Sequence, residues 1–413
     1  MAQGVLPYKY EEEKKSSSMT SLAGLPLYLD LAFALGIPEN IDRHLMLRPS
    51  QGWSDSRMVL SLMLLAIAGG DCVDDLRILE ADEGFCRVLE RIEPEEPARF
   101  RIKKARTFPS PSSVFRYLAS FRTTDPPVQG AASIPRSPAL GRFNLVNRDL
   151  VASVQQHDPS ATATLDMDAT IVETQKREAL FCYEGYRAYQ PLNVYWAEQE
   201  LLVHTEFRDG NVSANYDLLR VFTDALDALP EGIDRVRLRA DGAGYCHDLL
   251  AYCESGEHVR FGRIEFAVSC PVTEALKKET RLVPPDEWKR LDAQREWAEV
   301  GFVPNEIGHS KHGPTYRYLA VRDVLAQPVL PGMELPFQTC CLHGTQYKLR
   351  ALCSNMDWAG VSLPLPTSGA GRARRPTPCS KRISSGGSFP PAPSDQMRHG
   401  GGSPSLHSIC MQP

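Results

Sequence analysis

The segment from Thr162 to Thr170 reads Thr-Ala-Thr-Leu-Asp-Met-Asp-Ala-Thr, and its polar and apolar residues alternate up to Asp168. Because successive side chains of a strand point to opposite faces, the alternation predicts a β-strand with Thr164, Asp166 and Asp168 on one face. Carboxylates are depleted in strands, and they are costly to desolvate unless they are paired or bound to a metal ion. Two acids on one strand face therefore indicate either a solvated strand end or a functional site.

A second segment has the same character. Residues Arg235 to Asp241 read Arg-Val-Arg-Leu-Arg-Ala-Asp, which places Arg237, Arg239 and Asp241 on one face of a strand that stops at a glycine-rich turn. Carboxylates at the ends of two neighbouring strands form an all-oxygen site suited to Mg²⁺ or Mn²⁺. Two such ions can activate an attacking oxygen and stabilise a leaving one in phosphoryl transfer. The two strand ends therefore predict a metal site.

Length and composition narrow the class of protein. The chain has 413 residues and 42% hydrophobic content, which allows two or three domains with a sizeable core. The net charge of −5 is not that of a generic nucleic-acid binder, so DNA contacts would come from local basic patches. The eleven cysteines include no Cys-x-x-Cys pair, which favours reduced thiols in a cytoplasmic protein. The longest apolar run, Met58 to Ala68, is shorter than the roughly 20 residues of a membrane span, so we expect no membrane contact.

Residues 1–150 read as a helical region for DNA binding and assembly. Helical periodicity runs from about Gly24 to Glu90, with Ser54 or Asp55 placed to cap one helix. Farther along, Ser112 or Ser113 is placed to cap a short helix that would project Arg116 and Tyr117 toward DNA. A segment rich in Pro, Ala, Ser and Gly at 123–142 is typical of a linker. The candidate DNA-binding residues of this region are basic, although a solvated basic face explains them equally well: Arg101, Lys103, Lys104, Arg106 and Arg116.

The order of elements after Asp168 points to one fold class. We expect a hairpin, then a helix, the strand that ends at Asp241, a second helix and a last strand. Three strands in a meander followed by alternating helix and strand is the order of a ribonuclease-H-like α/β domain, in which the first and fourth strands lie side by side. The segments are Gln190–Trp196, Leu201–Phe207, Tyr216–Leu229, Arg235–Asp241, Tyr245–Cys253 and Ile264–Cys270.

Three motifs carry a resemblance to a known family. The segments Leu165-Asp-Met-Asp-Ala-Thr170, Arg208-Asp-Gly-Asn211 and Arg239-Ala-Asp-Gly-Ala-Gly-Tyr245 resemble those of the DDE transposases of bacterial insertion sequences, with a group 1 DDE domain. The resemblance covers roughly residues 20–360. It implies a catalytic domain at 151–360 with a β-rich insertion at about 271–345, and a tail at 361–413.

The resemblance also implies roles for particular residues. Asp168 and Asp241 match the first two catalytic acids, and Asp166 is the alternative to Asp168 or an auxiliary metal ligand beside it. Arg239, two residues before Asp241, is a further candidate for DNA contact. The implied cofactor is Mg²⁺ or Mn²⁺. The implied partners are double-stranded DNA, both the element ends and the target, and further copies of the chain.

The third acid that the family implies is missing from its expected place. It should be a Glu on a helix after a strand such as Tyr347–Cys353, but no Glu occurs beyond Glu334. After Asn355-Met-Asp-Trp358 the composition changes abruptly to Pro, Ser, Gly and Arg, and Asp395 is the only acid of the last fifty or so residues. No amphipathic helix fits this tail, so we expect it to be disordered.

A shifted reading frame explains the tail. The codons for residues 372–384 can read Ser-Glu-Lys-Ala-His-Ala-Val-Leu-Lys-Glu-Asp-Phe in a neighbouring frame, which is a helix with glutamates. We therefore predict that the chain is out of frame from about Val361 and that this copy is catalytically impaired. Asp357, Asp323 and Glu306 are the alternatives for a third ligand, although none sits on a suitable helix.

Two other functions compete with the transposase interpretation. The segment Asp166-Met-Asp168-Ala-Thr170 also resembles the first motif of haloacid-dehalogenase-like phosphatases, in which the first Asp is a nucleophile and the second an acid/base. That fold would continue with a helix and parallel strands rather than a hairpin. The other alternative is a remnant that binds element ends without cutting them.

Overall fold

A computed structural model describes residues 20–47, 52–92, 106–121, 137–304, 316–325, 335 and 337–357. The described residues divide into two compact units, one that ends at Pro159 and one that begins at Ser160. Among the described residues there is no helix long and apolar enough to cross a membrane.

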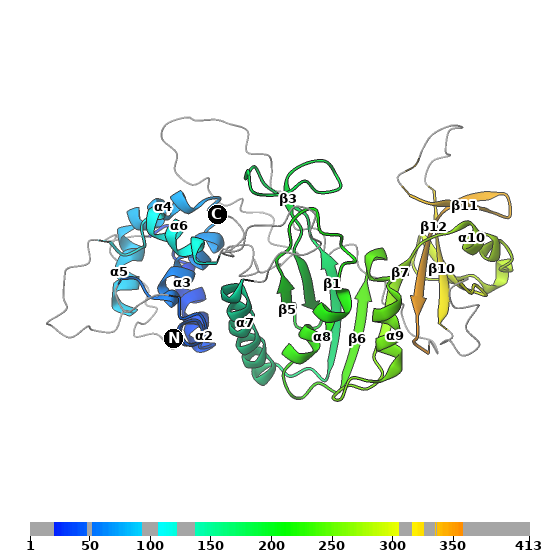
Figure 1. The fold of residues 1–413 in the computed structure, drawn as a ribbon, viewed down its shortest axis with the longest axis horizontal. Coiled ribbons are helices and arrows are strands. Elements are labelled where there is room, and N and C mark those ends of the chain that lie inside the picture. Colours follow the sequence, from blue (N-terminus) through cyan, green and yellow to red (C-terminus); the bar gives the residue numbers. More distant parts are fainter. Residues whose placement is uncertain are drawn as a thin grey trace. The chain divides into compact units, whose positions relative to one another are not determined.

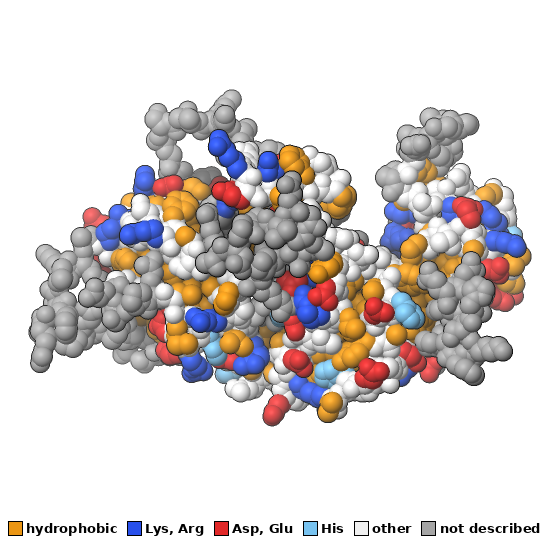
Figure 2. Space-filling model, viewed as in Figure 1, with side chains coloured by type: hydrophobic (Ala, Val, Ile, Leu, Met, Phe, Trp, Pro, Cys, Tyr) orange, Lys and Arg blue, Asp and Glu red, His pale blue; other side chains and the backbone are white. Residues whose placement is uncertain are grey.

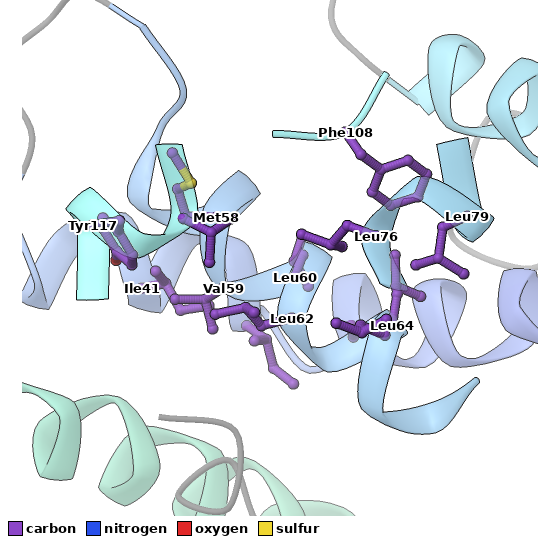
Figure 3. Close-up of a cluster of buried hydrophobic side chains, with 14 of the residues drawn as sticks. Ile41, Met58, Val59, Leu60, Leu62, Leu64, Leu76, Leu79, Phe108 and Tyr117 are labelled. Carbon is purple, nitrogen blue, oxygen red and sulfur yellow. The ribbon is translucent and has the colours of Figure 1, made fainter. Parts of the chain in front are cut away.

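The first unit is helical, as its sequence periodicity predicted. Its core contains Ile41, Met58, Leu76, Phe108 and Tyr117, all at most 1% exposed (Figure 3). The elements are α1 (Leu25–Ala34), α2 (Ile37–His44), α3 (Asp55–Ile67), the 3₁₀ turn η1 (Val73–Asp75), α4 (Leu76–Ala81), α5 (Glu83–Ile92), α6 (Pro111–Ala119) and α7 (Pro138–His157).

The helix caps follow the sequence in one case and depart from it in another. Ser54 caps α3, and its side chain accepts a hydrogen bond from the backbone N–H of Arg57, so this prediction is confirmed. The cap of α6 is Ser110 and not Ser112 or Ser113, because Pro111 takes the first helical position, where a missing N–H costs nothing. The predicted exposure of Tyr117 is also wrong, since this start aligns it with the buried face of the helix.

Helix α7 corrects the prediction of a linker at 123–142. Residues 123–136 lie outside the described part of the chain, but residues 138–142 form the first turn of a 20-residue helix. The composition of this segment did not distinguish a linker from a helix start, because Pro and small residues occur both in linkers and in the first turn of a helix. Position 150, the predicted domain boundary, lies inside this helix.

The second unit is built on one large mixed sheet with strand order β5-β4-β1-β6-β7-β12-β10-β9-β8, and β11 pairs with β12 (Figure 1). Helices α8 and α9 contact each other and pack against β5 and β7, respectively. The strands are β1 (Thr162–Ala169), β4 (Leu192–Trp196), β5 (Leu201–Glu206), β6 (Arg235–Ala240), β7 (Glu265–Cys270), β8 (Lys289–Arg290), β9 (Arg295–Val300), β10 (Arg317–Val324), β11 (Thr339–Leu342) and β12 (Thr345–Ser354). The remaining elements are β2 (Val172–Glu173), β3 (Ala188–Tyr189), α8 (Leu218–Ala228), η3 (Gly242–Gly244), α9 (His247–Ser255), α10 (Glu274–Arg281) and η4 (Pro285–Glu287).

The pairing of the central strands confirms the predicted neighbours. Strand β1 runs antiparallel to β4 and parallel to β6, so the strand that carries Asp168 lies beside the one that leads to Asp241. The alternation along β1 also holds, because Leu165 and Met167 are 0% and 3% exposed, whereas the acids between and after them are less deeply buried.

The region after β7 continues the same sheet. Strand β12 pairs antiparallel with β7, and β10 and β9 follow it, also antiparallel. The stretch predicted to be largely β also contains helix α10, whose N-cap Thr273 accepts a hydrogen bond from the N–H of Leu276. The sheet therefore extends from the central strands into this region without a break in strand pairing.

The helical unit depends on Phe108, which is fully buried and stacks on Phe85 with ring centroids 6.1 Å apart. We expect Phe108→Ala to lower the free energy of unfolding by about 3–5 kcal/mol, because it removes a buried ring and leaves a cavity. Phe115→Ala, at a ring 44% exposed on α6, is the matched control and should change the stability little. Denaturant unfolding of the three proteins measures the difference, and equal losses in both variants would contradict this account of the core.

Candidate functional site

The ends of β1 and β6 bring the two predicted aspartates together. The last pair of the parallel register joins Met167 to Ala240, so Asp168 and Asp241 follow at equivalent positions. Neighbouring strands lie about 4.8 Å apart, which sets the scale of the separation between the two backbones. Asp168 is half-buried and Asp241 is exposed, so the pair lies at the rim of the sheet.

The turn after β6 fixes the backbone and side chain of Asp241. Its carboxylate caps η3 and accepts a hydrogen bond of 2.9 Å from the N–H of Ala243. Gly244 is buried against the strand it follows, and a Cβ there would lie 2.3 Å from the Cβ of Ala240. The glycine of this motif is therefore required by a close approach, and it holds the turn against the end of β6.

The pKa of the Asp168 carboxyl lies well above its ordinary value. Burial raises the pKa of its carboxyl from 3.8 to about 6, and the negative charge of Asp241 adds to this effect. The N–H of Ala169 opposes the shift, and the charge of Asp166 makes a smaller contribution in the raising direction. Two carboxylates that repel each other are a hard oxygen donor set, and a divalent cation would relieve the repulsion. The residues present therefore fit Mg²⁺ or Mn²⁺.

Asp166 and Arg239 are each other's partners. They lie opposite one another in the β1–β6 register, and the guanidinium Nε and Nη2 each donate a 2.5 Å hydrogen bond to the carboxylate. The side chains of Asp166 and Arg239 are 14% and 15% exposed, respectively. Metal binding by Asp166, or DNA contact by Arg239, would require this bidentate pair to open, so both roles stay predictions.

The predicted basic residues lie in the helical unit. Arg101, Lys103 and Lys104 are outside the described residues. Arg106 is exposed and donates to the carbonyl of Phe108, and Arg116 is exposed on α6. Figure 2 shows basic and acidic side chains interspersed over the described surface in this view. DNA contact by these residues stays a prediction.

The structure separates two alternative third ligands from the aspartate pair. Asp323 lies on β10, four strands from β1, which corresponds to about 19 Å in the strand-to-strand direction alone. It pairs with Arg350 at 2.6 Å. Asp357 follows β12, whose last residue Ser354 pairs with Ala267 of β7, three strands from β1, and the chain runs there away from the end of β1 that carries Asp168. Glu306 is outside the described residues. Among the side chains that the structure describes, no group of three His, Cys, Asp or Glu is placed to hold a metal ion.

A hairpin beside the site was not predicted from the sequence. Strands β2 and β3 pair between β1 and β4, and the segment they enclose carries Phe181, Tyr183 and Tyr186. The motif that begins at Arg208 supports this hairpin, because the Asp209 carboxylate accepts a hydrogen bond from the N–H of Leu180. The glycine between two tyrosines, at 185, was the available signal for a turn.

Comparison with known proteins identifies the family. The model of the transposase DDE domain, group 1, matches residues 9–307, which is well over half of the chain. The chain therefore belongs to this family of transposase domains.

One solved structure is similar to this chain over most of its length. A piggyBac transposase in a synaptic complex with hairpin DNA, determined by cryo-EM, aligns with a TM-score of 0.34 and 10% identity. The alignment covers 81% of this chain and 63% of that one, so this chain spans less than two thirds of its length. A search of curated proteins found no match.

The phosphatase interpretation is wrong in the light of the family and the fold. After β1 the chain forms a hairpin and then the antiparallel strand β4, where a phosphatase of that class would continue with a helix and a parallel strand. The proposed nucleophile, Asp166, is also held by Arg239 in a bidentate pair.

The raised pKa of Asp168 gives a test of pH-dependent stability. Its folded-state pKa of about 6 exceeds 3.8, so the folded protein keeps a proton between about pH 4 and 6 that the unfolded chain has lost. Stability therefore falls as the pH rises through this window and stays lower above it. With a chelator present, Asp168→Asn should raise the stability at pH 7 by about 1 kcal/mol after allowance for solvent screening, or roughly 2–4 °C in Tm.

The difference should disappear below about pH 4, where both states of Asp168 are protonated. Asp234→Asn, at an exposed acid just before β6, is the control and should show no such pH dependence. Differential scanning calorimetry across this range measures both variants, and an Asp168→Asn protein no more stable than wild type at pH 7 would refute the account.

The Asp166–Arg239 pair gives a second test. Arg239→Met should destabilise the protein by roughly 3 kcal/mol, because it leaves a largely buried carboxylate unpaired. Arg237→Met, two residues earlier on the same face of β6, breaks the ion pair with Glu265. The two side chains of that pair are each 34% exposed, so the variant should lose less than about 1 kcal/mol of stability. Urea unfolding compares the two variants. Equal losses would show that burial does not distinguish the pairs.

Proposed function

We propose that the second unit is a ribonuclease-H-like catalytic domain of an insertion-sequence transposase. The support is the order β5-β4-β1-β6-β7, in which three antiparallel strands precede two strands parallel to the first. In this proposal the domain cuts DNA at the ends of a mobile element and joins them to target DNA. The observation that carries it is the pair of aspartates at equivalent positions of β1 and β6.

Asp168 and Asp241 would hold the divalent cations. When bound, such ions activate the attacking oxygen and stabilise the charge on the phosphate and the leaving oxygen. Asp241 is positioned for this by its cap to Ala243, and Asp168 by the register of β1. Water and then a freed 3′-hydroxyl would attack the phosphodiester in line, without a covalent protein intermediate. Asp166 would act on Asp168 through charge while its own oxygens bind Arg239.

The end of β12 defines where a third acid would have to come from. Ser354 pairs with Ala267, and the Asn355 amide side chain is fixed by the N–H of Phe266. Ser354 is level with Arg239, two residues of strand below Asp241. Continued in the same register to Asp357, the chain lies about five residues of strand below the aspartates and three strands from β1, a distance of about 20 Å. A helix that rises 1.5 Å per residue needs about 13 residues to cover it.

An acid that reaches the site from this exit would therefore lie near position 370 or beyond. The sequence between Asp357 and Asp395 contains no acid. We propose that this copy is catalytically impaired, and that a shifted frame from about Val361 replaced a helix with glutamates. A chain that binds element ends without cutting them is the second candidate function, and it is favoured by the same lack of an acid.

The partners follow from the same proposal. DNA ends and target DNA would contact the aspartate rim, and the helical unit, with Arg106 and Arg116 exposed, would add phosphate contacts. Further copies of the chain would assemble on the two ends of the element.

The test compares the chain as it stands with a frame-corrected version. The 413-residue protein should show no detectable cleavage with Mg²⁺ or Mn²⁺, whereas the corrected protein should cut DNA that carries the element's ends. In the corrected protein, Asp168→Asn and Asp241→Asn should each abolish cleavage. The expected loss of transition-state stabilisation is about 3 kcal/mol or more, the scale found when one electrostatic contact to the transition state is removed. Both variants should still bind DNA.

Asp234→Asn is the matched control, since it removes an exposed acid from the same strand region and should leave cleavage intact. Full cleavage by either aspartate variant would sink the assignment of the site. Robust strand transfer by the uncorrected chain would contradict the frameshift hypothesis.

A further inference from the structure

The hairpin between β1 and β4 presents two exposed aromatic rings. Phe181 is 58% exposed and Tyr183 is 80% exposed, while Ala179, Cys182 and Ala188 around them are buried. The apolar base of the hairpin is therefore packed, and its aromatic tip is left in solvent. Figure 1 shows the hairpin, labelled at β3, projecting beyond the sheet.

The tip is held rigidly by backbone hydrogen bonds. The N–H of Cys182 donates to the carbonyl of Tyr186 at 2.9 Å, and that of Gly185 donates to Cys182 at 3.0 Å. Gly185 has a φ of +86°, a conformation that L side chains rarely adopt, so the turn depends on this glycine. The rings are therefore presented on an ordered turn, and binding would require little further ordering.

Contacts beneath the tip fix its base and one ring. The carboxylate of Asp209 accepts from the N–H of Leu180, and a Cβ on Gly210 would lie 2.5 Å from the carbonyl oxygen of Ala188. The Arg187 guanidinium lies 4.7 Å from the centre of the Phe181 ring and donates to the carbonyls of Arg177 and Ala179. The motif that starts at Arg208 thus serves as the support of this hairpin.

The hairpin rises from the aspartate rim. The hairpin starts directly after β1, where the N–H of Thr170 donates to the carbonyl of Pro191. The pKa of Tyr183 lies above its ordinary value, through desolvation first and then through negative charges that include Asp241. The base of the hairpin adjoins the candidate site, because Asp168 pairs with Asn193 and Thr170 follows Asp168 by two residues.

We propose that Phe181 and Tyr183 stack on an unpaired base of the DNA next to the phosphate that the aspartates engage. Aromatic side chains on an ordered surface stack on any base, because every base has a flat π face. This inference rests on the proposed function, since it takes DNA as the substrate of the rim. In this role the hairpin positions the DNA end at the aspartates.

The test measures binding rather than cleavage. The full 413-residue chain, with no metal added, is titrated with fluorescent oligothymidylate and with a blunt duplex, and anisotropy gives the affinities. Phe181→Ala and Tyr183→Ala should each weaken oligothymidylate binding by roughly 5- to 100-fold, the range measured for loss of one base–aromatic stack. Duplex binding should change far less, because its bases are stacked on each other.

Two variants serve as controls. Tyr183→Phe keeps the ring and should bind oligothymidylate as the wild type does. Tyr28→Ala removes a tyrosine of α1 that is 52% exposed and should leave the affinity unchanged.

The outcomes separate this inference from the proposed function. If the wild type binds the oligonucleotide and both alanine variants bind it equally well, the stacking role is wrong while DNA binding stands. A Tyr183→Phe protein as weak as Tyr183→Ala would assign the effect to the hydroxyl and overturn stacking. A wild type that binds neither DNA would overturn the inference together with the proposed function. A change in self-association without a change in DNA affinity would make the tip a protein contact and overturn the inference as well.

Discussion

The parallel pairing of β1 with β6 is the constraint on which the site depends. It sets Asp168 and Asp241 at equivalent positions, and in the same register it sets Asp166 opposite Arg239. A slip of one residue would turn one of the two terminal aspartates to the other face of the sheet and would break the ion pair as well. The buried alternation of Leu165 with Met167 holds the register, so the core of the sheet determines the geometry of its rim.

The three acids of this region differ because of their surroundings. Asp166 has a guanidinium beside it and is neutralised within the sheet. Asp168 is partly buried and lies beside the negative charge of Asp241, and both effects raise its pKa. A fold that keeps a repelling pair of aspartates at its rim, next to a compensated pair of Asp and Arg, carries a local electrostatic cost that a bound cation would offset. That contrast distinguishes a binding site from a solvated strand end better than the presence of acids does.

The extension of the sheet beyond β7 decides how the chain can complete the site. Because β12 runs antiparallel to β7, the chain that follows its last pair, Ser354 with Ala267, runs away from the ends of β1 and β6 and is three strands from β1. Any later element has to cross the height of the sheet to reach the aspartates. The hairpin after β1 is already there, because it begins at the rim and Asp209 supports it.

The sequence by itself determined the elements whose pattern is local. Strand alternation fixed β1 and β6, and the cap at Ser54 fixed the start of α3. Tertiary structure decided what depends on neighbours distant in the chain: the pairing of Asp166 with Arg239, and the support of the hairpin after β1 by Asp209. Periodicity reports which face of an element is apolar, but it carries no information about which charged group another strand places opposite. The aspartate pair could be predicted because each acid ends its own strand, whereas its electrostatic state was set by the packing of the two strands.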